Sequence, residues 1–149
     1  LDRLGPECLI TPHPLEFSRL TGRPVAEIEG NRIQAAREFA QRTGALVLLK
    51  GSRTVVAAPD GRFYVNHTGN SGLAKGGSGD VLTGMIAGFA AQGAPLFQAA
   101  ALAACLHGAC ADLLALERSV YSILPSDLVE ILPILLKQLE KPAEAARLP

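Results

Sequence analysis

The residues best suited to chemistry form a glycine-rich segment, Lys75-Gly76-Gly77-Ser78-Gly79-Asp80, which leads directly into an amphipathic helix. Glycine lets several backbone N–H groups turn toward one point, and a helix start adds free amides and the positive end of its dipole. Together they predict an anion hole suited to phosphate. Because a carboxylate there would repel phosphate, Asp80 is best explained as a base acting on a neighbouring hydroxyl. A flexible loop with Asp80 as an ordinary helix cap is the alternative, since a lone glycine motif is weak evidence.

Two familiar phosphate loops do not fit this segment. In a Walker loop the lysine follows the glycines, whereas Lys75 precedes them and no Gly-Lys-Ser/Thr follows. A dinucleotide-binding fingerprint needs a strand directly before its glycines. Residues 67–79 are instead glycine-rich without periodicity, which predicts a long functional loop.

A second candidate site follows the apolar run ALVLL at 45–49, which predicts a strand buried on both faces. The next residues are Lys50-Gly51-Ser52-Arg53-Thr54. Ligands of open α/β sheets gather at the carboxyl ends of strands, so this position favours a ligand role. Gly51 and Ser52 offer amides and a hydroxyl, while Lys50 and Arg53 offer positive charge. A tight turn with surface cations explains the same residues equally well.

A third candidate is a histidine held between two prolines in Thr11-Pro12-His13-Pro14, with Glu16 close behind. The prolines forbid helix and fix an extended turn, so His13 has a preset direction. The turn follows a short apolar piece at 8–10 that predicts a strand. A histidine in such a loop is more often structural than catalytic, and the sequence leaves both roles open.

Other reactive side chains have structural explanations. His107 lies on an apolar helix beside Gly108, so we expect a core residue with its hydrogen bonds satisfied. Cys8, Cys105 and Cys110 have no disulfide or metal-ligand spacing, and we expect them to be reduced and inert.

The remaining pattern places these candidates on an α/β framework. Glycine stops, proline turns and apolar periodicity predict the elements. We expect strands at 8–10 and 45–49, a hairpin of 54–58 with 62–66, and helices at 14–20, 31–42, from about 80 onward, at 96–116 and from 126 or 127, the last kinked at Pro133.

Composition removes several function classes. Lysine plus arginine balance aspartate plus glutamate, and the formal net charge is zero, so no basic field attracts nucleic acid or an anionic membrane. The most apolar run, 99–110, is too short to cross a bilayer, and the start has no signal pattern. We therefore expect a cytoplasmic protein with neither partner.

Taken together, the motifs resemble a known family. Gly77-Ser78-Gly79-Asp80 is similar to the Gly-x-Gly-Asp motif of the ribokinase-like superfamily. With Thr11-Pro12-His13-Pro14-x-Glu16 and Leu49-Lys50-Gly51-x-x-Thr54 in that order, the chain resembles the narrower group of ADP/ATP-dependent NAD(P)H-hydrate dehydratases. The resemblance covers residues 10 to about 135.

The resemblance implies a ribokinase-like three-layer α/β/α fold with a mostly parallel sheet, and a repair enzyme that dehydrates (S)-NADH-hydrate or (S)-NADPH-hydrate using ADP or ATP with Mg²⁺. It also implies site roles. Asp80 would be the base, and Gly77, Ser78 and Gly79 would stabilise the moving phosphate; Lys50, Gly51, Ser52, Arg53 and Thr54, with Gly79, would line the adenine-nucleotide pocket; His13, with Asp80, would contact the hydrated nicotinamide nucleotide. No protein metal ligand is implied.

The chain departs from the family pattern at its start, where an Asp-Ala-Asp-type motif and substrate-side glycines are missing. We therefore expect residues 1–149 to be one truncated domain, its C-terminal portion, with an exposed sheet edge that favours pairing with another copy. A small-molecule kinase of the same fold, for thiazole or pyrimidine alcohols or for sugars, and an inactive nucleotide-binding fragment remain alternatives. ADP against ATP, and an epimerase domain upstream, stay open.

Overall fold

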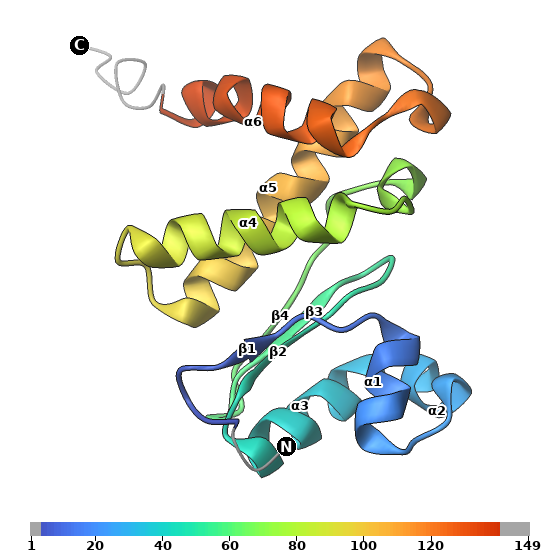
Figure 1. Ribbon diagram of the computed structural model, residues 1–149, viewed down its shortest axis with the longest axis vertical. Coiled ribbons are helices and arrows are strands. Elements are labelled where there is room, and N and C mark those ends of the chain that lie inside the picture. Colours follow the sequence, from blue (N-terminus) through green and yellow to red (C-terminus); the bar gives the residue numbers. More distant parts are fainter. Residues whose placement is uncertain (1–3, 141–149) are drawn as a thin grey trace, which may run out of the picture.

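The apolar run after Gly44 becomes strand β2 (Leu46–Leu49), and all four of its residues are buried. Successive side chains of a strand point to opposite faces, so a strand buried throughout needs cover on both sides. The computed structural model describes residues 4–140, and in them helices cover both faces of the sheet (Figure 1). The α/β expectation is confirmed.

The described elements follow the predicted order. The strands are β1 (Leu9–Ile10), β2 (Leu46–Leu49), β3 (Val55–Ala57) and β4 (Phe63–Val65). The helices are α1 (Pro14–Thr21), α2 (Val25–Gly30), α3 (Arg32–Thr43), α4 (Ser78–Ala91), α5 (Leu96–Glu117) and α6 (Pro125–Leu139).

The strands form one sheet in the order β1-β2-β3-β4. β1 pairs with β2 in parallel, whereas β2–β3 and β3–β4 are antiparallel. Among the described strands the sheet is therefore mixed, which corrects the expectation of a mostly parallel one. Residues 50–54 are too few for the crossover of about a dozen residues that a parallel connection from β2 to β3 would need.

Each face of the sheet carries its own hydrophobic cluster. Leu48 and its cross-strand partner Val56 belong to one cluster with the buried side chains of α4, α5 and α6. The alternate residues Val47, Leu49 and Val55 pack with Phe17, Ile28 and Phe39 from α1, α2 and α3. Figure 1 shows the two helical layers on opposite sides of the sheet.

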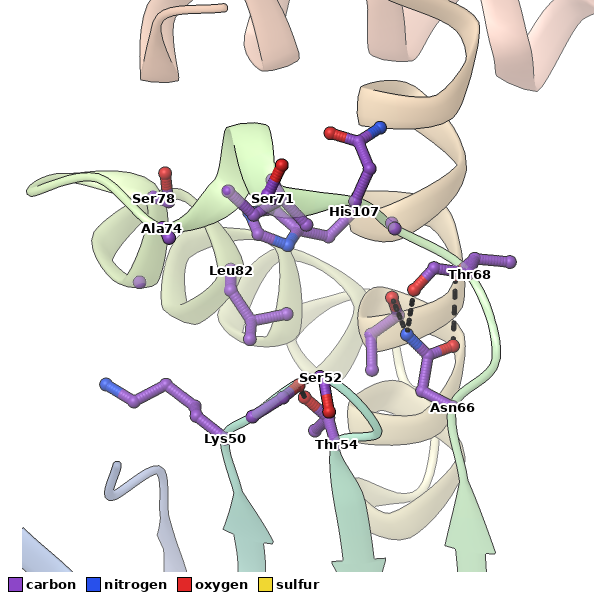
Figure 2. A pocket seen from close by; sticks show the side chains of 17 residues that line it. Lys50, Ser52, Thr54, Asn66, Thr68, Ser71, Ala74, Ser78, Leu82 and His107 are labelled. Atoms are coloured by element: carbon purple, nitrogen blue, oxygen red, sulfur yellow. Dashed lines mark hydrogen bonds between the residues drawn. The ribbon is translucent and has the colours of Figure 1, made fainter. Parts of the chain in front are cut away.

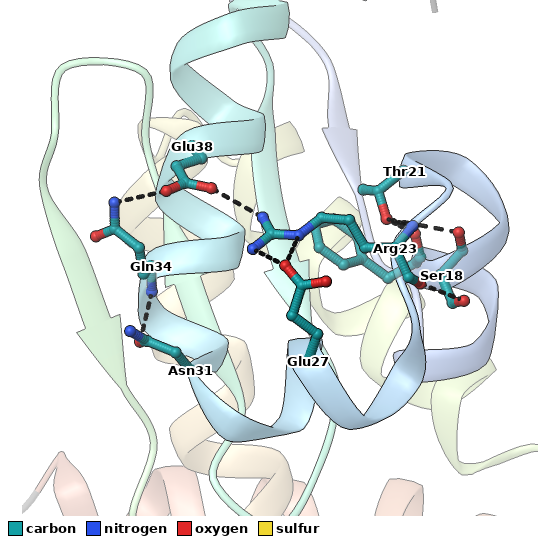
Figure 3. Close-up of polar contacts among 8 residues, drawn as sticks. Ser18, Thr21, Arg23, Glu27, Asn31, Gln34 and Glu38 are labelled. Atoms are coloured by element: carbon teal, nitrogen blue, oxygen red, sulfur yellow. Dashed lines mark hydrogen bonds and ion pairs between the residues drawn. The ribbon is translucent and has the colours of Figure 1, made fainter.

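The helix α2 was not predicted. Its six residues are too few to show helical periodicity, and it begins directly after Pro24. Arg23 connects it to its neighbours, because its guanidinium contacts Glu27 of α2 and Glu38 of α3 at 2.8–2.9 Å (Figure 3). Gln34 also donates to Glu38 at 2.8 Å.

Two predictions for the C-terminal helices need adjustment. α6 begins at Pro125, before the predicted start with Ser126 or Asp127 as its cap, and Asp127 lies inside the first turn and accepts from the Leu124 N–H at 2.8 Å. α5 extends beyond the run at 99–110 and is long and apolar enough to span a membrane by length and composition. More than half of its most apolar stretch is buried against the sheet, α4 and α6, so it is the central helix of this fold.

Candidate functional site

The loops after β1 and β2 meet at one edge of the sheet. Because these strands are parallel, their carboxyl ends lie side by side, and the Lys50 N–H donates to the Pro12 carbonyl at 2.9 Å. Two of the three predicted motifs are thereby joined through their backbones.

His13 caps α1 and is paired with an acid. Its Nδ1 accepts from the Glu16 N–H at 3.2 Å, and the Glu16 carboxylate accepts from the His13 N–H at 2.7 Å. His13 Nε2 lies 3.2 Å from Glu16 Oε1, and Lys50 Nζ lies 3.8 Å from Glu16 Oε2. The hydrogen bond from the His13 backbone, followed in importance by the charge of Lys50, lowers the pKa of Glu16. This carboxylate therefore stays ionised and orients both neighbours.

The third motif forms the start of α4. Gly77 has a φ of 92° as the residue before the helix, a left-handed conformation that favours glycine. The Ser78 and Asp80 amides donate to Lys75 and Gly77 carbonyls. Within residues 4–140 the Gly77 and Gly79 amides have no such acceptor, so these N–H groups are available to an anion.

Lys75, which begins this motif, has a structural role. Its ammonium donates to the carbonyls of Tyr121 and Ile123 at 2.7 and 2.6 Å. It therefore fastens the chain before α6 to the glycine segment and satisfies two carbonyl groups there.

Two cavities flank the α4 start. The first, the α1–α4 cavity, has a volume of about 550 Å³ and includes His13, Glu16, Lys50, Gly79 and Asp80 in its wall. The second, the β2–α5 cavity, has a volume of about 460 Å³ (Figure 2). Its wall includes Lys50, Gly51, Ser52, Thr54, Asn66, Thr68, Ser78, Gly79, Leu82, Ala104, His107 and Gly108. Both volumes are typical of small-molecule sites.

Lys50 and Gly79 line both cavities. A Cβ placed on Gly79 would stand 3.3 Å from Lys50 Nζ, so the ammonium lies against the first turn of α4. Positive charge, free amides and a helix start thus meet where the cavities adjoin.

The structure brings most of the predicted site residues together, with one exception. His13, Asp80 and Gly77 line the α1–α4 cavity, and Ser78 with the turn after β2 lines the other. Arg53 is exposed and lines neither cavity, so this structure gives no contact between its side chain and the site.

Sequence reasoning missed Arg32, which holds the turn after β2. Its Nη2 donates to the carbonyls of Leu49 and Lys50 at 3.0 and 2.6 Å, and its side chain is largely buried. A Cβ on Gly51 would collide with the guanidinium, so glycine is needed at that position for Arg32 to reach these carbonyls.

We predict that Arg32→Met lowers the free energy of unfolding by about 1.5–3 kcal/mol, because two hydrogen bonds from a charged donor are lost. Amide hydrogen exchange should accelerate at residues 49–54. Urea unfolding and exchange mass spectrometry measure both effects, and Arg19→Met on the exposed face of α1 is the matched control. Unchanged exchange at 49–54 would show that the turn holds itself.

Polar contacts that could not be predicted from sequence motifs fix the loop at 66–70 beside the β2–α5 cavity. Asn66 Nδ2 donates to the Ala104 and Thr68 carbonyls at 3.1 and 3.0 Å, and Thr68 Oγ1 donates to the Cys105 carbonyl at 2.7 Å. Asp112 accepts from the Gly69 N–H at 2.7 Å. These contacts attach residues 66–70 to α5 along one side.

His107 corrects the prediction of a satisfied core residue. It is 6% exposed and lines the β2–α5 cavity, but its Nε2 is buried without a hydrogen-bond partner in residues 4–140. Burial lowers the pKa of His107, while a weaker effect, its hydrogen bonding with the Ser78 backbone, acts to raise it. The ring is therefore neutral near pH 7.

Comparison with known proteins matches this arrangement to one family. A sequence profile described as NAD(P)H-hydrate dehydratase matches residues 3–134. The chain belongs to the NAD(P)H-hydrate dehydratase family. An ADP-dependent (S)-NAD(P)H-hydrate dehydratase of Bacillus subtilis is 46% identical over 138 residues, covering 93% of this chain and 50% of that protein. A bifunctional NAD(P)H-hydrate repair enzyme of Moorella thermoacetica is 48% identical over 136 residues, covering 91% and 26%. The chain thus spans at most about half the length of these two relatives.

Solved structures agree with the family and define the fold. The ADP/ATP-dependent NAD(P)H-hydrate dehydratase of Bacillus subtilis, co-crystallized with ATP/Mg²⁺, superposes with a TM-score of 0.87 at 43% identity, covering 92% of this chain and 51% of that one. A ribokinase-like superfamily protein of Enterococcus faecalis gives 0.81 at 33% identity, covering 93% and 46%. The fold is ribokinase-like, as predicted.

Proposed function

We propose that this segment carries out ADP- or ATP-dependent dehydration of (S)-NAD(P)H-hydrate to NAD(P)H. The observation that carries the proposal is the pair of adjoining cavities. Phosphoryl transfer needs two ligands that meet at one anion site, which we place at Lys50 and the Gly77 and Gly79 amides. Lys50 and Gly79 lie in both walls, where a phosphate in passage would sit. Family membership supports the choice of chemistry over a small-molecule kinase.

The adenine nucleotide binds in the β2–α5 cavity and the hydrated nicotinamide nucleotide in the α1–α4 cavity. Gly51, Ser52 and Thr54 line the first, while His13 and Asp80 line the second. Asp80 accepts the proton of the substrate hydroxyl while that oxygen attacks the terminal phosphoryl group, whose bond to the nucleotide breaks to release AMP from ADP or ADP from ATP. Phosphate then leaves the substrate carbon while the adjacent carbon loses a proton, and this elimination restores the dihydropyridine. The Gly77 and Gly79 amides and Lys50 stabilise the phosphate charge in transit.

Magnesium would enter with the nucleotide. Among residues 4–140 no three His, Cys, Asp or Glu side chains cluster to hold a metal ion. This fits an ion carried mainly by phosphate oxygens, which is how proteins commonly hold Mg²⁺, and Asp80 is the carboxylate in the cavity wall nearest in sequence to the anion site. Bound there, Mg²⁺ would neutralise phosphate charge.

The proposed activity is tested by the return of NADH absorbance when hydrated NADH is mixed with the protein and ADP, or with ATP. Recovery with either nucleotide supports the proposal and selects between them. Nucleotide hydrolysis or binding without recovery of the absorbance would contradict the dehydratase assignment.

Lys50→Ala should weaken adenine-nucleotide affinity by about ten- to a hundredfold, because a charge-assisted contact to phosphate is lost. Titration calorimetry with ADP measures the change. Lys137→Ala on α6, whose ammonium pairs with Glu140 far along the chain from both cavities, is the control. Equal affinities of the two variants would remove Lys50 from the phosphate site.

We further propose a cytoplasmic location and self-association, with residues 1–149 belonging to one ribokinase-like domain. The balanced charge and a cysteine spacing that fits neither a disulfide framework nor a zinc site support the location. Within the described sheet β1 pairs with β2 alone, and this free edge supports pairing with further strands or another copy.

A further inference from the structure

The polar lining of the β2–α5 cavity includes side chains whose hydrogen bonds the protein itself satisfies and a buried nitrogen whose hydrogen bond it does not. Asn66 is saturated, since its Nδ2 donates twice and its Oδ1 accepts from Tyr64 and contacts Thr68 Oγ1. Asn70 donates to Asp112 and accepts from the Gly72 N–H. In the same wall, His107 Nε2 has no partner within residues 4–140.

An unpaired buried polar atom is costly, by about 1–3 kcal/mol, so natural proteins retain one only where something offsets it. A water or a ligand atom in the cavity can supply the missing hydrogen bond. Figure 2 shows the His107 ring extending from α5 into the space above Leu82, close to Ser71.

The surroundings of His107 suit a flat aromatic group. Leu82, Leu73, Ala104 and Gly108 share the cavity wall with it and offer apolar surface. A ribose with two hydroxyls would leave polar groups unpaired against these side chains, whereas a purine buries its ring faces and presents hydrogen-bonding atoms only at its edge.

We propose that His107 is a specificity-determining residue that hydrogen-bonds the edge of the nucleotide's purine base through Nε2. This inference rests on the proposed function, because it places the adenine nucleotide in the β2–α5 cavity. The phosphates lie toward Lys50 and Gly79, which line both cavities, and the base lies toward His107, which lines only this one.

The neutral state of the ring serves this role. A neutral imidazole has one donor and one acceptor nitrogen, and adenine offers both an amino donor and ring-nitrogen acceptors at its edge. Burial disfavours the charged form of His107. The base is therefore met by a directional hydrogen bond instead of a second cation beside Lys50.

The test compares ligands with and without a base by titration calorimetry. ADP and pyrophosphate are titrated into the wild-type protein, into His107→Leu, which keeps the volume, and into His107→Gln, which keeps a polar end group. We expect ADP affinity to fall about tenfold in His107→Leu. Much of this loss should be restored in His107→Gln, and pyrophosphate affinity should stay unchanged in both. Thermal unfolding reports whether either variant fails to fold, and His107→Gln then carries the comparison.

The outcomes separate the two proposals. Equal losses for ADP and pyrophosphate would overturn the inference, because His107 would then act on the anion site through the neighbouring Ser78 backbone. Unchanged ADP affinity in His107→Leu would overturn it as well, leaving the proposed function intact. A wild-type protein that binds pyrophosphate but not ADP would instead contradict the proposed function and the inference with it.

Discussion

Asp80→Asn should lower turnover of hydrated NADH by about 10²–10⁴-fold, because the amide cannot accept the proton of the substrate hydroxyl. The substitution keeps the shape of the side chain at the wall of the α1–α4 cavity. Adenine-nucleotide affinity should persist, since the amides and the ammonium that we propose as phosphate contacts belong to Gly77, Gly79 and Lys50. The absorbance assay and calorimetry, applied to the native polypeptide that carries this sequence, measure the two quantities.

The split between turnover and affinity is what identifies a base. Gly77 is the N-cap of α4, so the predicted alternative of Asp80 as an ordinary helix cap is wrong. If Asp80 only stabilised the first turn of α4 through the helix dipole, the asparagine variant would keep its turnover. If the carboxylate mainly repelled phosphate, the variant would bind nucleotide more tightly and turn over normally. Glu130→Gln, which removes one exposed carboxylate on α6, controls for the change in net charge.

The local parts of the fold could be predicted because single residues decide them. Gly22 and Gly44 end α1 and α3 in the left-handed conformation, each with a φ of 72°, and glycine is the residue that adopts it without strain. The turn at 59–61 and the buried run of β2 were equally local signals. These signals place the His13 and Lys50 motifs directly after β1 and β2.

The rest depends on contacts between residues far apart in sequence. Arg32 reaches carbonyls 17 and 18 residues away, and Asn66 reaches a carbonyl 38 residues away. No spacing rule links such pairs, so their roles could not be predicted. The prediction for His107 was wrong for a related reason. An apolar helix predicts burial, but it does not reveal that one face of the helix borders a cavity.

Two lysines that stand in similar sequence motifs have different roles in the structure. Lys50 and Lys75 both stand beside glycines, yet Lys50 Nζ lies against the first turn of α4 while Lys75 Nζ donates to two carbonyls before α6. The difference arises because Lys50 directly follows the carboxyl end of β2, whereas Lys75 lies in the long loop next to the residues that precede α6. A lysine beside a glycine turn is therefore the better candidate for a phosphate contact when it directly follows the carboxyl end of a strand.

Gly108→Ala should destabilise the protein although alanine is the better helix former. Gly108 is buried within α5, and a Cβ there would overlap Thr68 Oγ1 and stand 2.6 Å from the Thr68 carbonyl oxygen. Thr68 cannot swing away cheaply, because its hydroxyl donates to the Cys105 carbonyl and its own carbonyl accepts from Asn66. Overpacking of this kind costs about 1–3 kcal/mol, which lowers Tm by roughly 4–10 °C in a chain of this size.

Gly88→Ala on α4 is the matched control, because a Cβ there meets nothing within 4 Å. That variant should gain about 0.5–1 kcal/mol from helix propensity alone. Calorimetric unfolding of the two variants measures the loss of stability that the clash causes. ADP affinity then shows whether the clash also disturbs the β2–α5 cavity, since the displaced loop at 66–70 forms part of its wall. If Gly108→Ala were as stable as Gly88→Ala, the loop at 66–70 would be able to move away from α5 at little cost. The β2–α5 cavity would then be too flexible to position a base against His107.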